Sequence, residues 1–308
     1  MKNILITGGA GFIGSHLADR LIEKGKNVII IDNLTTGERE NINPSAIFYK
    51  MDIRSLNLKK IFQNHDIKTV FHLAAQIDIR KSLSEIEYEI DVNIKGSVNL
   101  IVNAAKYGVE EIYFTSTGGA IYGEQNEYPA KEDHPLEPES PYGIDKMAIE
   151  KYLNCYKRIY GFKTFIFRLA NVYGPRQNSN SEAGVIAIFC NRMLKDKKIN
   201  IYGDGKQTRD FVFIEDVVSG IDKVFTTKKE GIYNISTSEE TDVNNVFDIL
   251  ADEMEYERKP IYLEMRPGEL LRSSLSYENI NKSVGWVPGH TIEEGLKKTA
   301  DWYKEEFK

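Results

Sequence analysis

The sequence predicts an α/β protein with a doubly wound parallel sheet and a smaller C-terminal lobe. Two observations predict this fold. Short apolar segments alternate with helix-like segments over the first half of the chain, which is typical of parallel strands joined by crossover helices. The first apolar segment also leads into a helical pattern through three glycines at a spacing of three, Gly8, Gly11 and Gly14. In such sheets ligands bind beyond the carboxyl ends of the strands, so functional residues are expected just after each apolar run.

Each element follows from a local pattern. The apolar run Ile4–Ile6 predicts a buried strand, and Ile13, Leu17 and Leu21 recur at helical spacing up to Gly25. Further apolar runs predict strands at 27–31, 46–49, 69–73, 111–115 and 164–169, and helical periodicity predicts helices at 56–62, 85–107, 142–160, 185–194, 216–225, 243–254 and 292–303. We therefore divide the chain into a first domain, 1–170, and a smaller lobe, 171–308. Residues 211–214 and 232–235 are expected to rejoin the main sheet.

The glycine turn predicts a Rossmann-like dinucleotide site. Glycines between a strand and a helix allow backbone N–H groups to approach a pyrophosphate, although a tight turn without a ligand has the same pattern. Asp32 ends the next strand, 24 residues after Gly8, where an acidic residue hydrogen-bonds the adenosine ribose. A carboxylate there repels a 2′-phosphate, and no basic residue occurs before Arg39, which favours NAD over NADP. Small polar groups for the ribose follow at Asn33, Thr35, Thr36 and Gly37.

Later strand ends add candidates for the same cofactor. Asp52 is expected to accept a hydrogen bond from the adenine amine, and Ile53 to flank the ring. Small residues after the fourth strand let the backbone pass close to a cofactor, and this segment comprises Leu73, Ala74, Ala75 and Gln76. Asn93 is a further candidate for the cofactor, although it lies within a predicted helix, where an asparagine is more often simply solvated.

A tyrosine and a lysine in one predicted helix are candidate catalytic residues. Tyr142 and Lys146 are four residues apart and therefore share a helix face. A lysine beside a phenol stabilises the phenolate and lowers its pKa, so that the tyrosine can act as a general base near neutral pH. Such a pair alone is usually structural. After a dinucleotide turn, and with the hydroxyl residues Ser116 and Thr117 at a strand end upstream, a catalytic role is favoured.

Composition excludes several classes of function. The net charge of −6 argues against a nucleic-acid partner. The five histidines and two cysteines show no metal-ligand spacing, so no metal is expected. No apolar run approaches the roughly 20 residues that a membrane span needs. Because the first strand begins almost at Met1, we expect no signal peptide and a cytoplasmic protein.

Together these residues resemble the extended short-chain dehydrogenase/reductase family, in its nucleotide-sugar epimerase/dehydratase branch. The resemblance rests on the glycine turn with Phe12 and Ile13, on Asp32, and on Thr117, Tyr142 and Lys146. Three later segments also resemble motifs of the branch: 168–176, which leads into the sugar-nucleotide site, 203–212, a uridine-diphosphate-binding turn, and 266–269, which meets the diphosphate and ribose. The similarity extends from Met1 to the predicted C-terminal helix.

The resemblance implies roles for these residues. Tyr142 would take the proton of the sugar C4 hydroxyl while C4 gives its hydride to tightly held NAD, and Lys146 would orient the nicotinamide ribose. Thr117 would hydrogen-bond the same sugar oxygen, with Ser116 as the alternative if the register differs by one. The substrate site would also include Asn171, Val185, Arg209, Arg266, Glu269 and Ser273. We expect a homodimer that pairs the helices 90–107 and 142–160.

The segment after Thr117 separates the reactions of the branch. Dehydratases of the branch carry an Asp-Glu pair directly after the catalytic threonine, whereas here Gly118 and Gly119 follow. The resemblance therefore favours a 4-epimerase of UDP-glucose that works through a transient 4-keto sugar. Ser273 is small where strict glucose enzymes often carry a bulky residue, which leaves room for UDP-GlcNAc; alternatively, Ser273 is an ordinary loop residue. A 4,6-dehydratase, an NADPH-dependent sugar reductase and a non-catalytic NAD-binding regulator remain alternatives.

Overall fold

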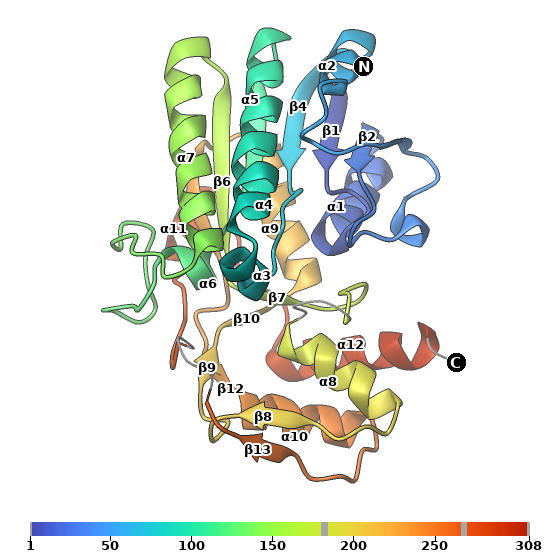
Figure 1. The fold of residues 1–308 in the computed structure, drawn as a ribbon, viewed down its shortest axis with the longest axis vertical. Coiled ribbons are helices and arrows are strands. Elements are labelled where there is room, and N and C mark those ends of the chain that lie inside the picture. The colour runs from blue at the N-terminus through green and yellow to red at the C-terminus, as the bar shows by residue number, and fades with distance from the viewer. Residues whose placement is uncertain (1, 180–183, 266–269, 307–308) are drawn as a thin grey trace.

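A parallel sheet forms the centre of the fold (Figure 1). The computed structural model describes residues 2–179, 184–265 and 270–306. Its seven-stranded sheet has the order β11-β6-β5-β4-β1-β2-β3, and every pairing in it is parallel. The strands are β1 (Asn3–Thr7), β2 (Asn27–Asp32), β3 (Ile47–Lys50), β4 (Ile67–His72), β5 (Glu111–Thr117), β6 (Lys163–Leu169) and β11 (Gly231–Ile235). The strand order changes direction between β1 and β4, which is where doubly wound sheets bind ligands.

Helices cover both faces of this sheet, because its strands alternate apolar side chains to each side. On one face Ile4, Ile6 and Ile30 pack against α1 (Phe12–Glu23), α9 (Ile214–Thr227) and α11 (Glu278–Val284). On the other face Leu5, Ile29 and Ile31 belong to the core that contains α2 (Leu58–Asn64), α5 (Gly96–Lys106) and α7 (Pro141–Tyr160). The doubly wound fold that the sequence predicts is confirmed.

A smaller lobe lies beyond the carboxyl ends of the strands, at the bottom of Figure 1. Its separate apolar core includes Phe189, Val246 and Leu296 from three helices. These helices are α8 (Val185–Leu194), α10 (Val243–Glu253) and α12 (Ile292–Glu306), and short strands accompany them: β8 (Asn200–Tyr202) with β13 (Ile261–Leu263), and β9 (Thr208–Arg209) with β12 (Thr241–Asp242).

Two expectations about the elements need correction. Residues 232–235 join the main sheet in β11, but the prediction that 211–214 also join it is wrong. β10 (Phe211–Phe213) pairs with β7 (Asn171–Tyr173) in a separate two-stranded sheet, because β11 already occupies the edge beside β6.

The helix expected at 85–107 is also interrupted. It comprises α4 (Ile86–Ile90), the π-helix η2 (Asp91–Lys95) and α5, and it is preceded by α3 (Ile79–Ser84), which the periodicity did not show. Single π-helical turns within a helix are rare and frequently occur at functional sites.

Candidate active site

The glycine turn brings the ends of β1 and β4 into contact. Gly8 has φ of +74°, and a Cβ there would lie 2.8 Å from the Ala74 nitrogen. A Cβ on Gly14 would lie 2.1 Å from the Gly8 carbonyl oxygen, so the turn closes only around glycine. α1 begins directly after Gly11, and among the described residues no side chain caps its first turn. The exposed N–H groups of this turn suit an anionic pyrophosphate.

Asp32 is held at the end of β2 as the ribose site requires. Its two oxygens accept from the Ala10 nitrogen at 3.0 Å and from the Leu34 nitrogen at 2.8 Å. A carboxylate has about four lone-pair sites, so two remain for hydroxyl donors. Burial raises the pKa of Asp32. Gly37 lies close by, since a Cβ there would stand 3.0 Å from Asp32 Oδ1. The turn and this carboxylate together fit the adenosine half of NAD.

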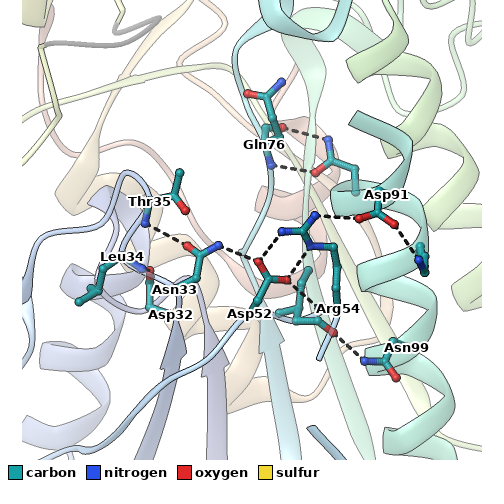
Figure 2. A network of polar contacts seen from close by, with 12 residues as sticks. Asp32, Asn33, Leu34, Thr35, Asp52, Arg54, Gln76, Asp91 and Asn99 are labelled. Carbon is teal, nitrogen blue, oxygen red and sulfur yellow. Dashed lines mark hydrogen bonds and ion pairs between the residues drawn. The ribbon is translucent and has the colours of Figure 1, made fainter. Parts of the chain in front are cut away.

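Asp52 lies beside this site, but its oxygens are already engaged (Figure 2). Arg54 donates to it from N, Nε and Nη2 at 2.8–2.9 Å, and Asn33 donates from Nδ2 at 2.9 Å. Arg54 holds the pKa of Asp52 at about 2. These four donors use all of its lone-pair sites, so an adenine amine would have to displace one of them. The sequence analysis did not foresee Arg54, which also donates to Asp91 at 2.7 Å.

The other residues expected near the cofactor contact α5, the end of β1 and the loop after β2. Ile53 is buried against α5, where a Cβ on Gly96 would lie 2.7 Å from it. The segment after β4 runs along the end of β1, with the Leu73 nitrogen donating to the Thr7 carbonyl oxygen. Thr35 donates its backbone N–H to Asn33 Oδ1 at 3.0 Å, and the Thr36 carbonyl oxygen accepts from Asn178.

Asn93 is not the solvated residue that a mid-helix asparagine usually is. It lies in η2, is buried, and accepts from the Gln76 nitrogen at 2.8 Å while donating to the Gln76 carbonyl oxygen at 3.0 Å. Figure 2 shows Gln76, in the segment after β4, with these two hydrogen bonds drawn as dashed lines. The structure thus brings two of the predicted cofactor residues into direct contact.

Thr117, Tyr142 and Lys146 come together at the carboxyl end of β5. α7 begins at Pro141, and the Ser140 hydroxyl caps it by accepting from the Gly143 nitrogen at 3.2 Å. This start places Tyr142 near the carboxyl end of β5, where the Thr117 side chain acts to lower the pKa of its phenol. Lys146 is buried, and its Nζ donates to the Thr115 carbonyl oxygen at 2.8 Å and lies 5.7 Å from the Tyr142 ring centroid.

The pKa of Tyr142 differs from the expectation. The sequence predicts that Lys146 lowers it, whereas burial and the negative charge of Glu89 raise it, and only the hydrogen bond with Thr117 opposes this rise. Burial also lowers the pKa of Lys146 to about 8. The reason is geometric, since the ammonium points to the Thr115 carbonyl oxygen and not to the phenol. Ser116, the alternative to Thr117, is buried with no hydrogen-bond partner among the described residues.

Two of the predicted substrate residues, Asn171 and Ser273, lie where the lobe meets the sheet. Asn171 begins β7, and a Cβ on Gly119 would lie 3.7 Å from its Oδ1, so its side chain reaches the turn after Thr117. Ser273 is buried, and its carbonyl oxygen accepts from the backbone nitrogen of Asp210 at 2.9 Å. The carbonyl oxygen of Asp210 in turn accepts from the backbone nitrogen of Asn171, also at 2.9 Å. Asp210 therefore joins these two residues through its backbone.

The remaining substrate residues are spread over the lobe. Arg209 is half-buried in β9, and its Nη1 donates to the Thr208 carbonyl oxygen at 2.8 Å. Val185 is half-buried at the first position of α8. Arg266 and Glu269 lie outside the described residues.

The comparison with known protein families agrees with this geometry. The profile of the NAD dependent epimerase/dehydratase family matches residues 4–236. The chain belongs to this family.

Relatives over the full length include a putative UDP-glucose 4-epimerase of Methanocaldococcus jannaschii, 46% identical over 98% of both chains. A crystal structure of the Thermotoga maritima UDP-glucose 4-epimerase with UDP-glucose is 43% identical, covers 99% of this chain and all of that chain, and superposes with a TM-score of 0.96. The UDP-N-acetylglucosamine 4-epimerase of Methanobrevibacter ruminantium, in complex with UDP-N-acetylmuramic acid, is 33% identical over 99% of both chains with a TM-score of 0.93.

Two buried carboxylates near the site, Glu89 and Asp145, were not predicted from the sequence. The negative charge of Glu89 acts to raise the pKa of both Tyr142 and Lys146, and Asp145 lies next to Lys146 in α7. These carboxylates were hidden because acidic residues in amphipathic helices normally face solvent. Among residues 2–179, 184–265 and 270–306, no cluster of His, Cys, Asp or Glu is arranged to hold a metal. Within the same ranges no helix is long and apolar enough to cross a membrane.

Proposed function

We propose that this protein is a UDP-hexose 4-epimerase that interconverts UDP-glucose and UDP-galactose through a transient 4-keto sugar. The observation that carries the proposal is the trio Thr117, Tyr142 and Lys146 followed, after Thr117, directly by two glycines. A Cβ on Gly118 would lie 2.1 Å from Leu275 Cδ1, so the acid pair of a dehydratase does not fit after Thr117 unless Leu275 moves. Without that pair the keto sugar has no route to lose water.

NAD, when bound, supplies the reversible hydride acceptor for this reaction. The residues of the chain supply the proton chemistry and the orientation. Thr117 and Tyr142 hold the sugar O4 between them, and Tyr142 takes the O4 proton as C4 loses its hydride and gives the proton back when the hydride returns. Lys146, whose ammonium donates to the Thr115 carbonyl oxygen, would orient the nicotinamide ribose. Return of the hydride to the opposite face of the keto sugar gives the C4 epimer.

The test is incubation of the purified protein with UDP-glucose and no added cofactor, followed by proton NMR of the anomeric signals. The proposal expects UDP-galactose to appear. Accumulation of a 4-keto-6-deoxy sugar would instead establish a dehydratase, and turnover only with stoichiometric reduced cofactor would establish a reductase. If the protein holds NAD and releases no product from UDP-hexoses, a regulatory role replaces the proposal.

We further propose that the site accepts UDP-GlcNAc. Ser273 supports this, because a small residue at the position that the resemblance assigns beside C2 of the sugar would leave room for an N-acetyl group. A UDP-N-acetylglucosamine 4-epimerase is also among the similar structures. Ser273→Tyr should reduce the rate with UDP-GlcNAc strongly while largely preserving the rate with UDP-glucose. An equal loss with both sugars would show that another residue sets the width of the site.

A further inference from the structure

Glu89 is a buried carboxylate that lies between two parts of the site. One is the segment after β4 that includes Gln76, and the other is α7, the catalytic helix, which carries Tyr142 and Lys146. It lies in α4, one helical turn before Asn93, and its side chain is 0% exposed. One oxygen accepts from Gln76 Nε2 at 2.6 Å, and the other accepts from Asn93 Nδ2 at 2.7 Å. Because Asn93 also bonds the backbone of Gln76, the three residues close a ring of hydrogen bonds. This ring fixes the segment that follows β4.

Glu89 also acts through its charge on Tyr142 and Lys146, which lie in the catalytic helix α7. α4 and η2 both pack against α7, which carries Tyr142 and Lys146. A buried carboxylate is costly unless it is hydrogen-bonded or balanced by a cation. Burial raises the pKa of Glu89, and its two amide donors and the charge of Lys146 oppose this rise. In return, Glu89 is the carboxylate whose charge supports the protonated form of Lys146 most strongly.

We propose that Glu89 is a positioning residue of the active site: it holds the Gln76 and Asn93 amides in place and supplies a buried carboxylate in the element that packs against α7, the helix that carries Lys146. The catalytic part of this inference rests on the proposed epimerase function. The electrostatic part does not, since it concerns the protonation of one lysine in the folded protein.

Other charged groups around Lys146 set the background for this effect. Asp145 and Glu150, both in α7, also favour the protonated lysine, and His72 in β4 opposes it. Asp78, the N-cap of α3, acts on Glu89 itself. Because Glu89 acts on Lys146 and Tyr142 in the same sense, its removal should lower the pKa of both groups. Simple damage to the fold, in contrast, would reduce the rate without lowering the pKa of Lys146.

The experiment is Glu89→Gln, which removes the charge and keeps the shape. The pKa of Lys146 is measured by NMR of ¹³Cε-labelled lysine, with the signal assigned by its absence in Lys146→Arg. In the wild type one lysine should titrate near 8, apart from the bulk of the lysines near 10.5. In E89Q this pKa should fall by about one unit. Glu87→Gln is the matched control, because Glu87 lies two residues away in α4 but is exposed, and it should leave the pKa unchanged.

The outcomes separate this inference from the proposed function. A pKa of Lys146 that is the same in E89Q and the wild type overturns the inference, whatever the activity. A lowered pKa in a protein that does not epimerise UDP-glucose supports the role of Glu89 and rejects the function. If E89Q does not fold, Glu89→Asp withdraws the carboxylate by one methylene and should lower the pKa by about half as much; an unchanged pKa in that variant likewise overturns the inference.

Discussion

Tyr142 is the residue on which the proposed chemistry depends. Its side chain is half-buried, and its pKa is raised above the ordinary value by burial and by the charge of Glu89. In the protein without ligands, the phenol therefore keeps its proton at neutral pH, and it must lose that proton before it can accept the proton of the sugar hydroxyl. A raised pKa also makes the phenolate, once formed, a stronger base toward the sugar hydroxyl.

Tyr142→Phe should abolish most of the activity without disturbing the fold. Loss of a general acid–base group costs about 10³-fold in rate. The variant should still retain NAD, because the glycine turn and Asp32 are untouched. Tyr152→Phe is the control, since Tyr152 lies in the same helix with its side chain 41% exposed. Comparable rates for the wild type and Y142F would remove Tyr142 from the mechanism.

Asp145 makes stability depend on pH in an uncommon direction. It is buried, its Oδ2 has no hydrogen-bond partner among the described residues, and burial with the nearby charge of Glu89 raises its pKa to about 6. The folded state therefore binds this proton more tightly than the unfolded state, where the pKa is 3.8. The ionised carboxylate destabilises the fold above pH 6, and the penalty disappears as the pH falls toward 4.

Asp145→Asn should accordingly raise the unfolding free energy relative to the wild type more at pH 7 than at pH 4. The difference in its effect between the two pH values should reach up to about 3 kcal/mol, because each unit of pKa shift corresponds to about 1.4 kcal/mol. Urea unfolding of both proteins at the two pH values measures it. An effect of D145N on the unfolding free energy that is the same at pH 4 and pH 7 would show that Asp145 titrates normally.

At the scale of elements, the turn from β1 into α1 is the least tolerant part of the cofactor site. A Cβ on Gly14 would meet Gly8 and Gly9 backbone atoms at 2.1 to 2.9 Å, and backbone cannot move aside cheaply. Gly14→Ala should therefore yield protein that purifies with little NAD, as judged by the nucleotide released on denaturation. Gly25→Ala is the control: Gly25 has φ of +70°, but a Cβ there would have no atom within 4 Å, so only about 1 kcal/mol of strain is expected. Normal NAD content in G14A would contradict the proposed pyrophosphate site.

The elements show what the sequence can and cannot predict. The strands β1 and β2, the helix α1 and the fit around Asp32 follow from local patterns, because apolar runs, glycines and an acidic residue at a fixed spacing are all visible along the chain. The fate of 211–214 was not predictable in this way. Whether a short buried strand joins the main sheet depends on which strand occupies the edge beside β6, and that is a long-range competition.

The charged surroundings of the site were hidden for a similar reason. Arg54 and Glu89 are ordinary surface residues by composition and spacing, and their importance arises only when β3, α4 and η2 come together. Asn93 is predicted from the sequence to contact the cofactor, but its bonds to Gln76 depend on the π-turn, for which the sequence has no periodic signature. Local patterns therefore locate the site, and tertiary packing decides its electrostatics.

At the scale of the whole molecule, one face presents apolar side chains to solvent. α5 and α7 lie side by side in Figure 1, and Val102, Tyr152 and Ile159 on them are 41 to 66% exposed. An exposed apolar face on two neighbouring helices fits an interface with a second copy of the chain. We therefore expect a homodimer. Val102→Glu should give monomers by size-exclusion chromatography with light scattering, whereas Val287→Glu, 54% exposed on another part of the surface, should not. A wild-type protein that is monomeric at micromolar concentration would contradict this expectation.

The proposed reaction returns the C4 hydrogen to the carbon that lost it, and proton NMR of UDP-glucose turned over in D₂O without added cofactor tests this directly. We predict UDP-galactose that carries hydrogen at both C4 and C5, because no proton from solvent enters a carbon–hydrogen bond. Deuterium at C5 or C6 together with a 4-keto-6-deoxy sugar would show elimination of water, and deuterium at C4 would show that the hydride is not conserved. Either result would contradict the assignment of this site to 4-epimerisation.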